Sequence, residues 1–429
     1  MQSINSIIVL IIRGGNLALV LITGVILARV LGPDEYGAYS FVLAIISLLA
    51  VLAAFGLPEL VTRNISSYLQ KKDYGRLVGL SVRSLQLTLV ASLFSSAIAI
   101  VWLILDETLN FSLIMAFIVS LLVPIQALSA VRGGALRGLG HVKISQLPEM
   151  LFQPTAFLIA IALVWYFQSE ITSIEALFSR VVAALLALMV GTILLVAKWP
   201  KVQSSVSPIY ETARWLDSAK SFVLISALWV VLGQSDIIIL GLMSVPADVG
   251  VYKVAVTAGS LVLYVLLSVN TVIGPTISSA YAAGDAKELQ LIVKRASRFA
   301  VIFSLPIAVL LITFGQQLLS LVFGEEYTAA YAPLIILTLA HLFNAAMGSV
   351  ALTLNMTGHE KLTFRSQLFA VIFNVLLNII LIPFFGIVGA AVATAVAIVI
   401  SNSFLVFHVW KKLGFNPTVF GYIKYRAAS

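Results

Sequence analysis

The sequence lacks cysteine and is poor in charged residues and histidine. Its 429 residues include no Cys, four His and 10% charged residues in total. Without cysteine the chain can form neither a disulfide nor a thiolate metal site. The scattered histidines show no metal-ligand spacing either, so we expect no bound metal. Soluble domains carry about 25% charged residues, and the low value therefore excludes an ordinary soluble protein.

Motifs for nucleotide chemistry are also missing. No Gly-x4-Gly-Lys-Ser/Thr segment occurs, so the chain has no phosphate-binding loop of that type, and we expect no cofactor. The net charge of +8 would favour a nucleic-acid partner in a soluble protein. In a membrane protein, however, cytoplasmic loops collect Lys and Arg, so the sequence predicts no nucleic-acid partner.

What the chain has in abundance is apolar residues, which make up 61% of it. Its length leaves room for about a dozen membrane spans of ~20 residues with short connections. We expect spans near 7–31, 39–61, 84–105, 111–131, 145–167, 176–197, 221–243, 251–274, 299–315, 332–353, 364–383 and 389–409. The predicted fold is all-α and integral to the membrane, with twelve transmembrane helices in two pseudo-symmetric six-helix bundles around a central cavity.

The two halves share a short signature, which occupies residues 32–39 and residues 245–252. Three of its residues recur 213 residues later with the same spacing, and further pairs follow at similar offsets. The matching pairs are Pro33 and Pro246, Gly37 and Gly250, Tyr39 and Tyr252, Asp73 and Asp285, and Gly140-His141 and Gly358-His359. The chain is therefore interpreted as an internal duplication of one membrane unit, and many transporters form a central path from such repeats.

The positions of Lys and Arg predict the orientation. With the first residues in the cytoplasm, 22 of the 26 Lys and Arg fall in cytoplasmic connections or the tail. We therefore expect a multi-pass protein of the cytoplasmic (inner) membrane with both termini in the cytoplasm. The expected domains are a bundle at 1–198, a cytoplasmic linker at 199–220, a second bundle at 221–410 and a cytoplasmic tail at 411–429.

Polar residues inside the spans are the candidates for function, because each intramembrane charge costs ~2.5–3.5 kcal/mol unless it is paired or hydrated. Arg13, Asn16 and Thr23 share one face of the first span, and the repeat offset maps Thr23 onto Asp236. We expect these faces to line the cavity, with Asp236 as the coupling residue. The alternatives are that Arg13 reaches cytoplasmic headgroups and that Asp236 pairs with Arg29 or Lys253.

Three further residues are weaker cavity candidates. Glu149 lies at a cytoplasmic helix end, where pairing with Arg63 or contact with water is the simpler interpretation. Asn374 and Asn378 lie one turn apart, and could line a polar face or hydrogen-bond between helices.

Other segments resemble a known family. The segment from Leu27 to Gly37, LARVLGPDEYG, closely resembles the signature after the first helix of polysaccharide (O-antigen-type) flippases. These belong to the multidrug/oligosaccharidyl-lipid/polysaccharide exporter superfamily. The segments from Leu321 to Tyr327 and from Phe373 to Thr394 resemble the family's loop after helix 9 and its hairpin of helices 11 and 12.

The resemblance implies two six-helix bundles that move a lipid-diphosphate-linked oligosaccharide, of undecaprenyl-diphosphate type, by alternating access. It implies that Arg13 matches a cavity arginine that contacts the diphosphate. A polysaccharide polymerase and glycosyltransferases of the same pathway are the implied partners, besides the phospholipid bilayer.

Two other functions are weighed against this one. A cation-coupled multidrug antiporter of the same superfamily would use Asp236 as its ion or proton carboxylate. A membrane glycosyltransferase or polysaccharide polymerase would need an active site outside the hydrocarbon, for which the short outer loops leave little room. We therefore predict a transporter and not an enzyme.

Overall fold

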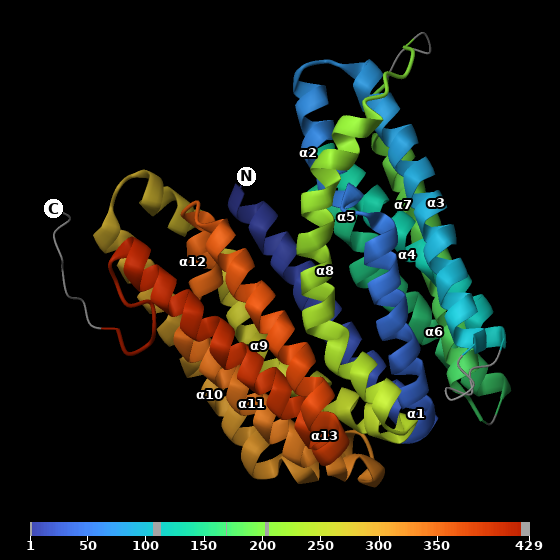
Figure 1. Cartoon of the computed structure of the whole chain (residues 1–429), viewed down its shortest axis with the longest axis vertical. Coiled ribbons are helices and arrows are strands. Elements are labelled where there is room, and N and C mark those ends of the chain that lie inside the picture. Colours follow the sequence, from blue (N-terminus) through green and yellow to red (C-terminus); the bar gives the residue numbers. More distant parts are fainter. Residues whose placement is uncertain (1, 106–112, 169, 202–205, 422–429) are drawn as a thin grey trace. The chain divides into compact units, whose positions relative to one another are not determined.

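A computed structural model describes the chain except residues 1, 106–112, 169, 202–205 and 422–429 (Figure 1). All regular structure among the described residues is helical, which confirms the predicted all-α class. Part of the predicted linker, 202–205, and much of the predicted tail, 422–429, lie outside the described residues.

Ten helical segments of the described chain are long and apolar enough to cross a membrane. Two of them are 60 and 54 residues long, which is far more than one crossing needs. The first is interrupted at Gly32 (φ 70°) and the other at Gly386 (φ 52°), and each glycine is adjacent to or three residues from a proline. Each long segment therefore holds two spans, which is consistent with the predicted twelve.

The described chain forms two compact units. The first unit comprises residues 1–23 and 38–234. Its helices are α1 (Gln2–Ala54, except 24–37), α2 (Leu57–Gln70), α3 (Tyr74–Leu105), α4 (Leu113–Gly138), α5 (Val142–Leu147), the π-helical turn η2 (Pro148–Phe152), α6 (Gln153–Phe167), α7 (Ser173–Lys198) and most of α8 (Thr212–Met243). Helix α4 contacts α2, α3 and α7, so it is the central helix of this unit.

The second unit comprises residues 24–37 and 235–429. Its helices are the end of α8, α9 (Pro246–Ala282), α10 (Ala286–Val322), the 3-10 turn η3 (Glu325–Ala330), α11 (Tyr331–Met347), α12 (Val350–Met356) and α13 (Glu360–Leu413). Helix α11 packs against α9, α10 and α13. The predicted division into six-helix bundles at 1–198 and 221–410, joined by a linker, stays a prediction.

The residues paired by the repeat have the same local structure. Asp73 precedes α3 and its carboxylate accepts a hydrogen bond from the backbone N–H of Arg76 (3.1 Å). Asp285 precedes α10 and accepts in the same way from the N–H of Glu288 (2.9 Å). Each aspartate satisfies an N–H that the first turn of a helix leaves without a partner.

The second matched pair also behaves alike. Gly140 and Gly358 both have positive φ, 84° and 77°. The histidine that follows each donates its backbone N–H five residues back, His141 to Leu136 O (2.9 Å) and His359 to Leu354 O (2.8 Å). Both glycines thus end one helix and lead into the next. These shared details are consistent with a duplicated unit.

Within the second unit, the two copies of the signature pack on each other through glycine. A Cβ on Gly37 would lie 2.6 Å from the carbonyl carbon of Pro246 and 2.9 Å from Gly250 N. A Cβ on Gly250 would lie 3.0 Å from the carbonyl carbon of Pro33 and 3.1 Å from Gly37 N. The backbones of the two segments therefore touch, and only residues without a side chain allow that approach.

Candidate functional site

A buried carboxylate lies at the centre of a polar cluster in the second unit. Asp236, at the end of α8, is 6% exposed. It accepts a hydrogen bond from the hydroxyl of Tyr252 on α9 (2.6 Å) and one from the backbone N–H of Ile237 (3.0 Å). The hydroxyl of Thr394 on α13 donates to the same carboxylate over a longer distance of 3.4 Å. Side chains of two helices, α9 and α13, therefore converge on the carboxylate of a third.

The two predicted asparagines extend this cluster. Asn374 accepts a hydrogen bond from the Ser235 hydroxyl (2.6 Å) and donates to the hydroxyl of Thr394 (3.2 Å). Asn378 donates to the backbone carbonyl of Asn374 (3.0 Å) and to its side-chain oxygen (3.1 Å). Both asparagines are buried. The described contacts are thus hydrogen bonds between helices, and a cavity role for these residues stays a prediction.

Neither cation considered as a partner of Asp236 makes an ion pair with it. Among the described residues, Arg29 instead donates to the last carbonyls of α10, Val322 O (2.7 Å) and Leu321 O. No ion pair within 4.0 Å joins Lys253 to Asp236 in the described part of the chain. Lys253 still lies close enough for its charge to act on Asp236. A buried carboxylate without a direct ion pair is nevertheless costly, so it favours taking up a proton or a small cation. The surrounding hydroxyl and amide oxygens are the ligand type that hard cations prefer.

Two of the predicted residues of the first unit, Asn16 and Glu149, lie at the π-helical turn η2. Asn16 of α1 donates to the carbonyl of Met150 (2.7 Å), which lies within that turn. Glu149, the residue before it, is ion-paired with Arg132 of α4. π-Turns free backbone carbonyls from the helical pattern, and they occur frequently at functional sites. The structure therefore brings Asn16 of α1 to the turn that holds Glu149.

Arg132 is the functional candidate that sequence reasoning missed. The predicted span 111–131 ends just before Arg132, but α4 continues through Gly133 and Gly134 to Gly138. The reason is packing, because a Cβ on Gly134 would lie 3.0 Å from the carbonyl carbon of Pro58 on α2 and closer still to its oxygen. The glycine allows close helix contact and does not mark a turn. Arg132 is consequently buried, 5% exposed at its side chain, and also donates to Ala187 O (3.2 Å).

The simpler interpretation of Glu149 was also wrong in its partner. Arg63 bonds the side chain of Asn64 (3.3 Å) and lies over the ring of Phe222. Glu149 pairs with Arg132 and keeps a third of its side chain exposed. The cavity role of Glu149 stays a prediction.

The remaining two candidates lie on α1. Arg13 is exposed, and Thr23 is half-buried with a hydroxyl that finds no hydrogen-bond partner among the described residues. The cavity roles predicted for Arg13 and Thr23 stay predictions. Tyr252 and Thr394, which complete the Asp236 cluster, lie in segments that the sequence had already singled out, the repeated signature and the Phe373–Thr394 hairpin. Their common target could not be seen there.

Comparison with known proteins identifies the family. The family model described as polysaccharide biosynthesis protein matches residues 4–281, and the MatE model matches residues 222–380. The "Probable low-salt glycan biosynthesis flippase Agl15" of Haloferax volcanii is 24% identical over 391 residues, which cover 87% of this chain and 76% of the relative. "Probable flippase AglR" of the same organism is 28% identical over 276 residues, 63% of this chain and 55% of that protein.

Solved structures show the same fold. An inward-facing multidrug resistance MATE family transporter of the MOP superfamily superimposes with a TM-score of 0.73 at 14% identity, covering 93% of this chain and 95% of that one. Lipid II flippase MurJ, in an inward closed conformation, gives a TM-score of 0.72 at 15% identity and covers 93% and 86%. These likenesses confirm the transporter fold that the signature segments implied. Because its family model matches well over half of the sequence, the chain belongs to the polysaccharide biosynthesis protein family.

Proposed function

We propose that this protein is a flippase that moves a lipid-linked oligosaccharide, a surface-polysaccharide or glycan repeat unit, across a membrane. The observation that carries the proposal is the alignment with a relative named as a probable glycan biosynthesis flippase, which extends over 87% of this chain. Such a protein moves its substrate without making or breaking a covalent bond, so it is a transporter and not an enzyme.

The physical problem of this transport agrees with the residues present. The lipid tail of the substrate stays in the bilayer, so only the glycan and its phosphates need a polar path. Arg13 and Asn16 supply polar groups on α1, a membrane-spanning helix, and Asn16 bonds the turn that holds Glu149. We propose Arg13 as the cation that offsets the cost of moving a diphosphate.

The finer parts of the proposal concern location and partners. The carrier lipid is of undecaprenyl-diphosphate type, the membrane is the cytoplasmic one, and both termini lie in the cytoplasm, as the bias of Lys and Arg predicts. A polysaccharide polymerase and glycosyltransferases would then act on either side of the transport step.

We propose that the Asp236 cluster couples transport to a proton or a monovalent cation. A carboxylate held by Tyr252 and Thr394 changes its hydrogen bonds when it takes up a positive charge. Because those partners lie on α9 and α13, the change reaches three helices of one unit. Alternating access then follows if the two states of the cluster favour different conformations.

The test is transport by the purified full chain in proteoliposomes. A fluorescent polyprenyl-diphosphate oligosaccharide is placed in both leaflets, and the fraction accessible to a membrane-impermeant quencher is followed over time. We expect faster exchange than in protein-free vesicles, and a loss of ion or pH dependence in Asp236→Asn. Asp217→Asn is the matched control, because Asp217 is 82% exposed. No exchange above the protein-free rate would refute the flippase function.

A second candidate is a cation-coupled multidrug antiporter. It is favoured by the MatE family model at residues 222–380. Cells that express the protein should then tolerate cationic drugs better than cells that express Asp236→Asn. Unchanged drug sensitivity would leave the flippase as the supported function.

A further inference from the structure

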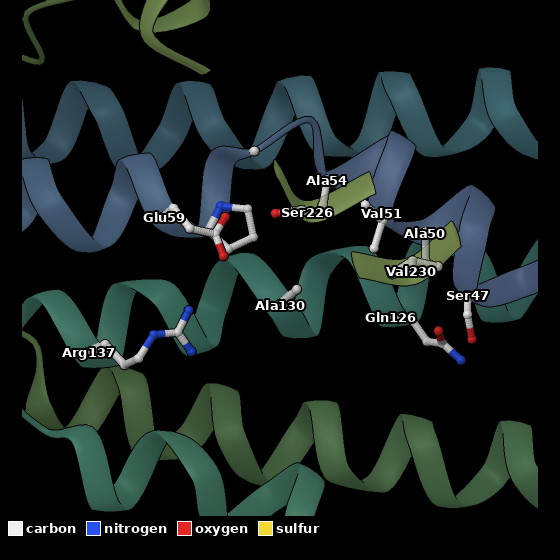
Figure 2. A pocket seen from close by; sticks show the side chains of 12 residues that line it. Ser47, Ala50, Val51, Ala54, Glu59, Gln126, Ala130, Arg137, Ser226 and Val230 are labelled. Carbon is white, nitrogen blue, oxygen red and sulfur yellow. The ribbon is translucent and has the colours of Figure 1, made fainter. Parts of the chain in front are cut away.

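A cavity of about 320 Å³ lies in the first unit where α1 ends and α2 begins (Figure 2). Its walls come from α1, α2, α4 and the first part of α8, all within one unit. The polar lining residues are Ser47, Glu59, Gln126, Arg137 and Ser226, and the apolar ones are mostly alanine and valine. None of these residues belongs to the clusters around Asp236 or Glu149.

The cavity exists because the helix is broken there. Phe55 and Gly56 both have positive φ, 46° and 66°, so the chain leaves α1 at Ala54 and starts α2 at Leu57. Helix α8 holds this break in place, since a Cβ on Gly56 would lie 2.7 Å from Cβ of Phe222. A break of this kind separates two helix ends whose backbone groups have no helical partners. Ala54, Gly56 and Pro58, at this break, line the cavity.

Two opposite charges face this space from different helices. Glu59 of α2 and Arg137 of α4 extend into it from opposite walls (Figure 2). Within the described part of the chain, neither side chain makes an ion pair or a hydrogen bond. Gln126 likewise has no hydrogen-bond partner in that part of the chain. Three groups capable of strong hydrogen bonds are thus available to a ligand.

The mixture of groups selects the chemistry of that ligand. An anion would meet the carboxylate of Glu59, and a cation would meet the guanidinium of Arg137. A neutral sugar satisfies both, because its hydroxyls donate to a carboxylate and accept from a guanidinium, and the Gln126 amide does either. The volume is at the lower end of the ~300–1,000 Å³ typical of ligand pockets, which suits a small part of a glycan.

We infer that this pocket binds a neutral sugar residue and is the glycan subsite of the transporter. Its assignment to the transported glycan rests on the proposed flippase function, whereas sugar binding itself does not. Glu59 and Arg137 contact the sugar hydroxyls, and Ala130 and Val230 pack against its carbon-bound hydrogens. The pocket therefore holds the head of the substrate while its lipid stays in the bilayer.

The test measures sugar binding directly. The full chain is placed in nanodiscs of phosphatidylethanolamine and phosphatidylglycerol, which contain no sugar. Glucose, galactose, mannose and N-acetylglucosamine are the probes, and ligand-observed NMR gives a Kd for each. We expect Glu59→Gln and Arg137→Gln each to raise the Kd of the sugar that binds by about tenfold, which is the effect of losing one charged hydrogen-bond partner.

A third variant and two controls separate binding from folding. Ala130→Leu keeps every charge but fills the cavity, so it should abolish sugar binding without lowering the melting temperature by more than the two charge variants do. Lys71→Gln and Asp217→Asn change exposed charges of the same unit outside the cavity and should bind as the natural protein does. Inorganic pyrophosphate should not compete with the sugar.

Several results would overturn the inference. They are binding of none of the four sugars, binding that is unchanged in Glu59→Gln, Arg137→Gln and Ala130→Leu, or competition by pyrophosphate. Opposite effects of the two charge variants, tighter binding for Glu59→Gln and weaker for Arg137→Gln, would show an anion site instead. The two proposals can be refuted separately. Transport without sugar binding would refute the sugar pocket alone, and sugar binding without transport would refute the flippase function alone.

Discussion

The contact between the two copies of the signature gives the sharpest prediction for stability. In Gly37→Ala the new Cβ would lie 2.6 Å from the carbonyl carbon of Pro246, whereas ordinary contact begins at 3.4 Å. The carbonyl oxygen of Pro246 would lie closer still, so the two segments must separate by more than about 0.8 Å at this point. The obstructing atoms belong to the backbone, so no side-chain rotation relieves the clash.

The magnitude follows from overpacking. A substitution that forces backbone shifts in a packed region costs about 1–3 kcal/mol. Gly250→Ala obstructs the same contact from the other side, with a Cβ 3.0 Å from the carbonyl carbon of Pro33. Because one separation relieves both clashes, the double variant should lose less stability than the sum of the single variants.

The assay is thermal unfolding of the purified protein, followed by fluorescence in detergent. We expect Gly37→Ala and Gly250→Ala to lower the apparent melting temperature by several degrees. Gly233→Ala is the control, because a Cβ there meets nothing within 4 Å and alanine favours the interior of α8 by about 0.5–1 kcal/mol. A Gly37→Ala protein as stable as Gly233→Ala, or strict additivity in the double variant, would refute the shared contact.

Three further predictions concern charged residues. Glu149→Gln should destabilise the protein by a few kcal/mol, because it leaves the buried guanidinium of Arg132 unpaired. Arg132→Gln should destabilise it less, because the carboxylate that it leaves unpaired belongs to a side chain that is a third exposed. Equal losses of melting temperature in the two variants would contradict this. Partial burial raises the pKa of Asp73. The hydrogen bonds from the backbone and guanidinium of Arg76 lower that pKa by a larger amount, so the folded pKa lies below its usual value. The stability that Asp73 contributes is therefore present above its unfolded pKa of about 3.9 and is lost as pH falls through the lower folded pKa. Between pH 6 and pH 3 the melting temperature of Asp73→Asn should fall less than that of the natural protein. Arg29→Gln removes two donors to the last carbonyls of α10, so amide hydrogen exchange should rise in the residues that follow, and unchanged exchange would show that these bonds add nothing.

Local properties of the sequence predicted much of the fold. Spans follow from apolar length, and the break at Gly32 before Pro33 is fixed by what those two residues allow in their own backbone. The paired aspartates and glycines also act locally, as helix caps and helix ends. The helices nevertheless extend beyond the predicted spans, as α9 and α10 do with 37 residues each, because a helix does not stop where the hydrocarbon ends.

The composition of each cluster depended on tertiary structure. That Asp236 is polar and intramembrane was visible in the sequence, but its partners Tyr252 and Thr394 lie 16 and 158 residues away. Arg132 lay outside the predicted span because the sequence does not distinguish a glycine that permits close helix packing from a glycine that ends a helix. The sequence by itself determined where the chain crosses and turns, since these depend on neighbouring residues. Only the tertiary structure decided which polar groups meet, because that depends on how each helix is rotated and packed against helices distant in the chain.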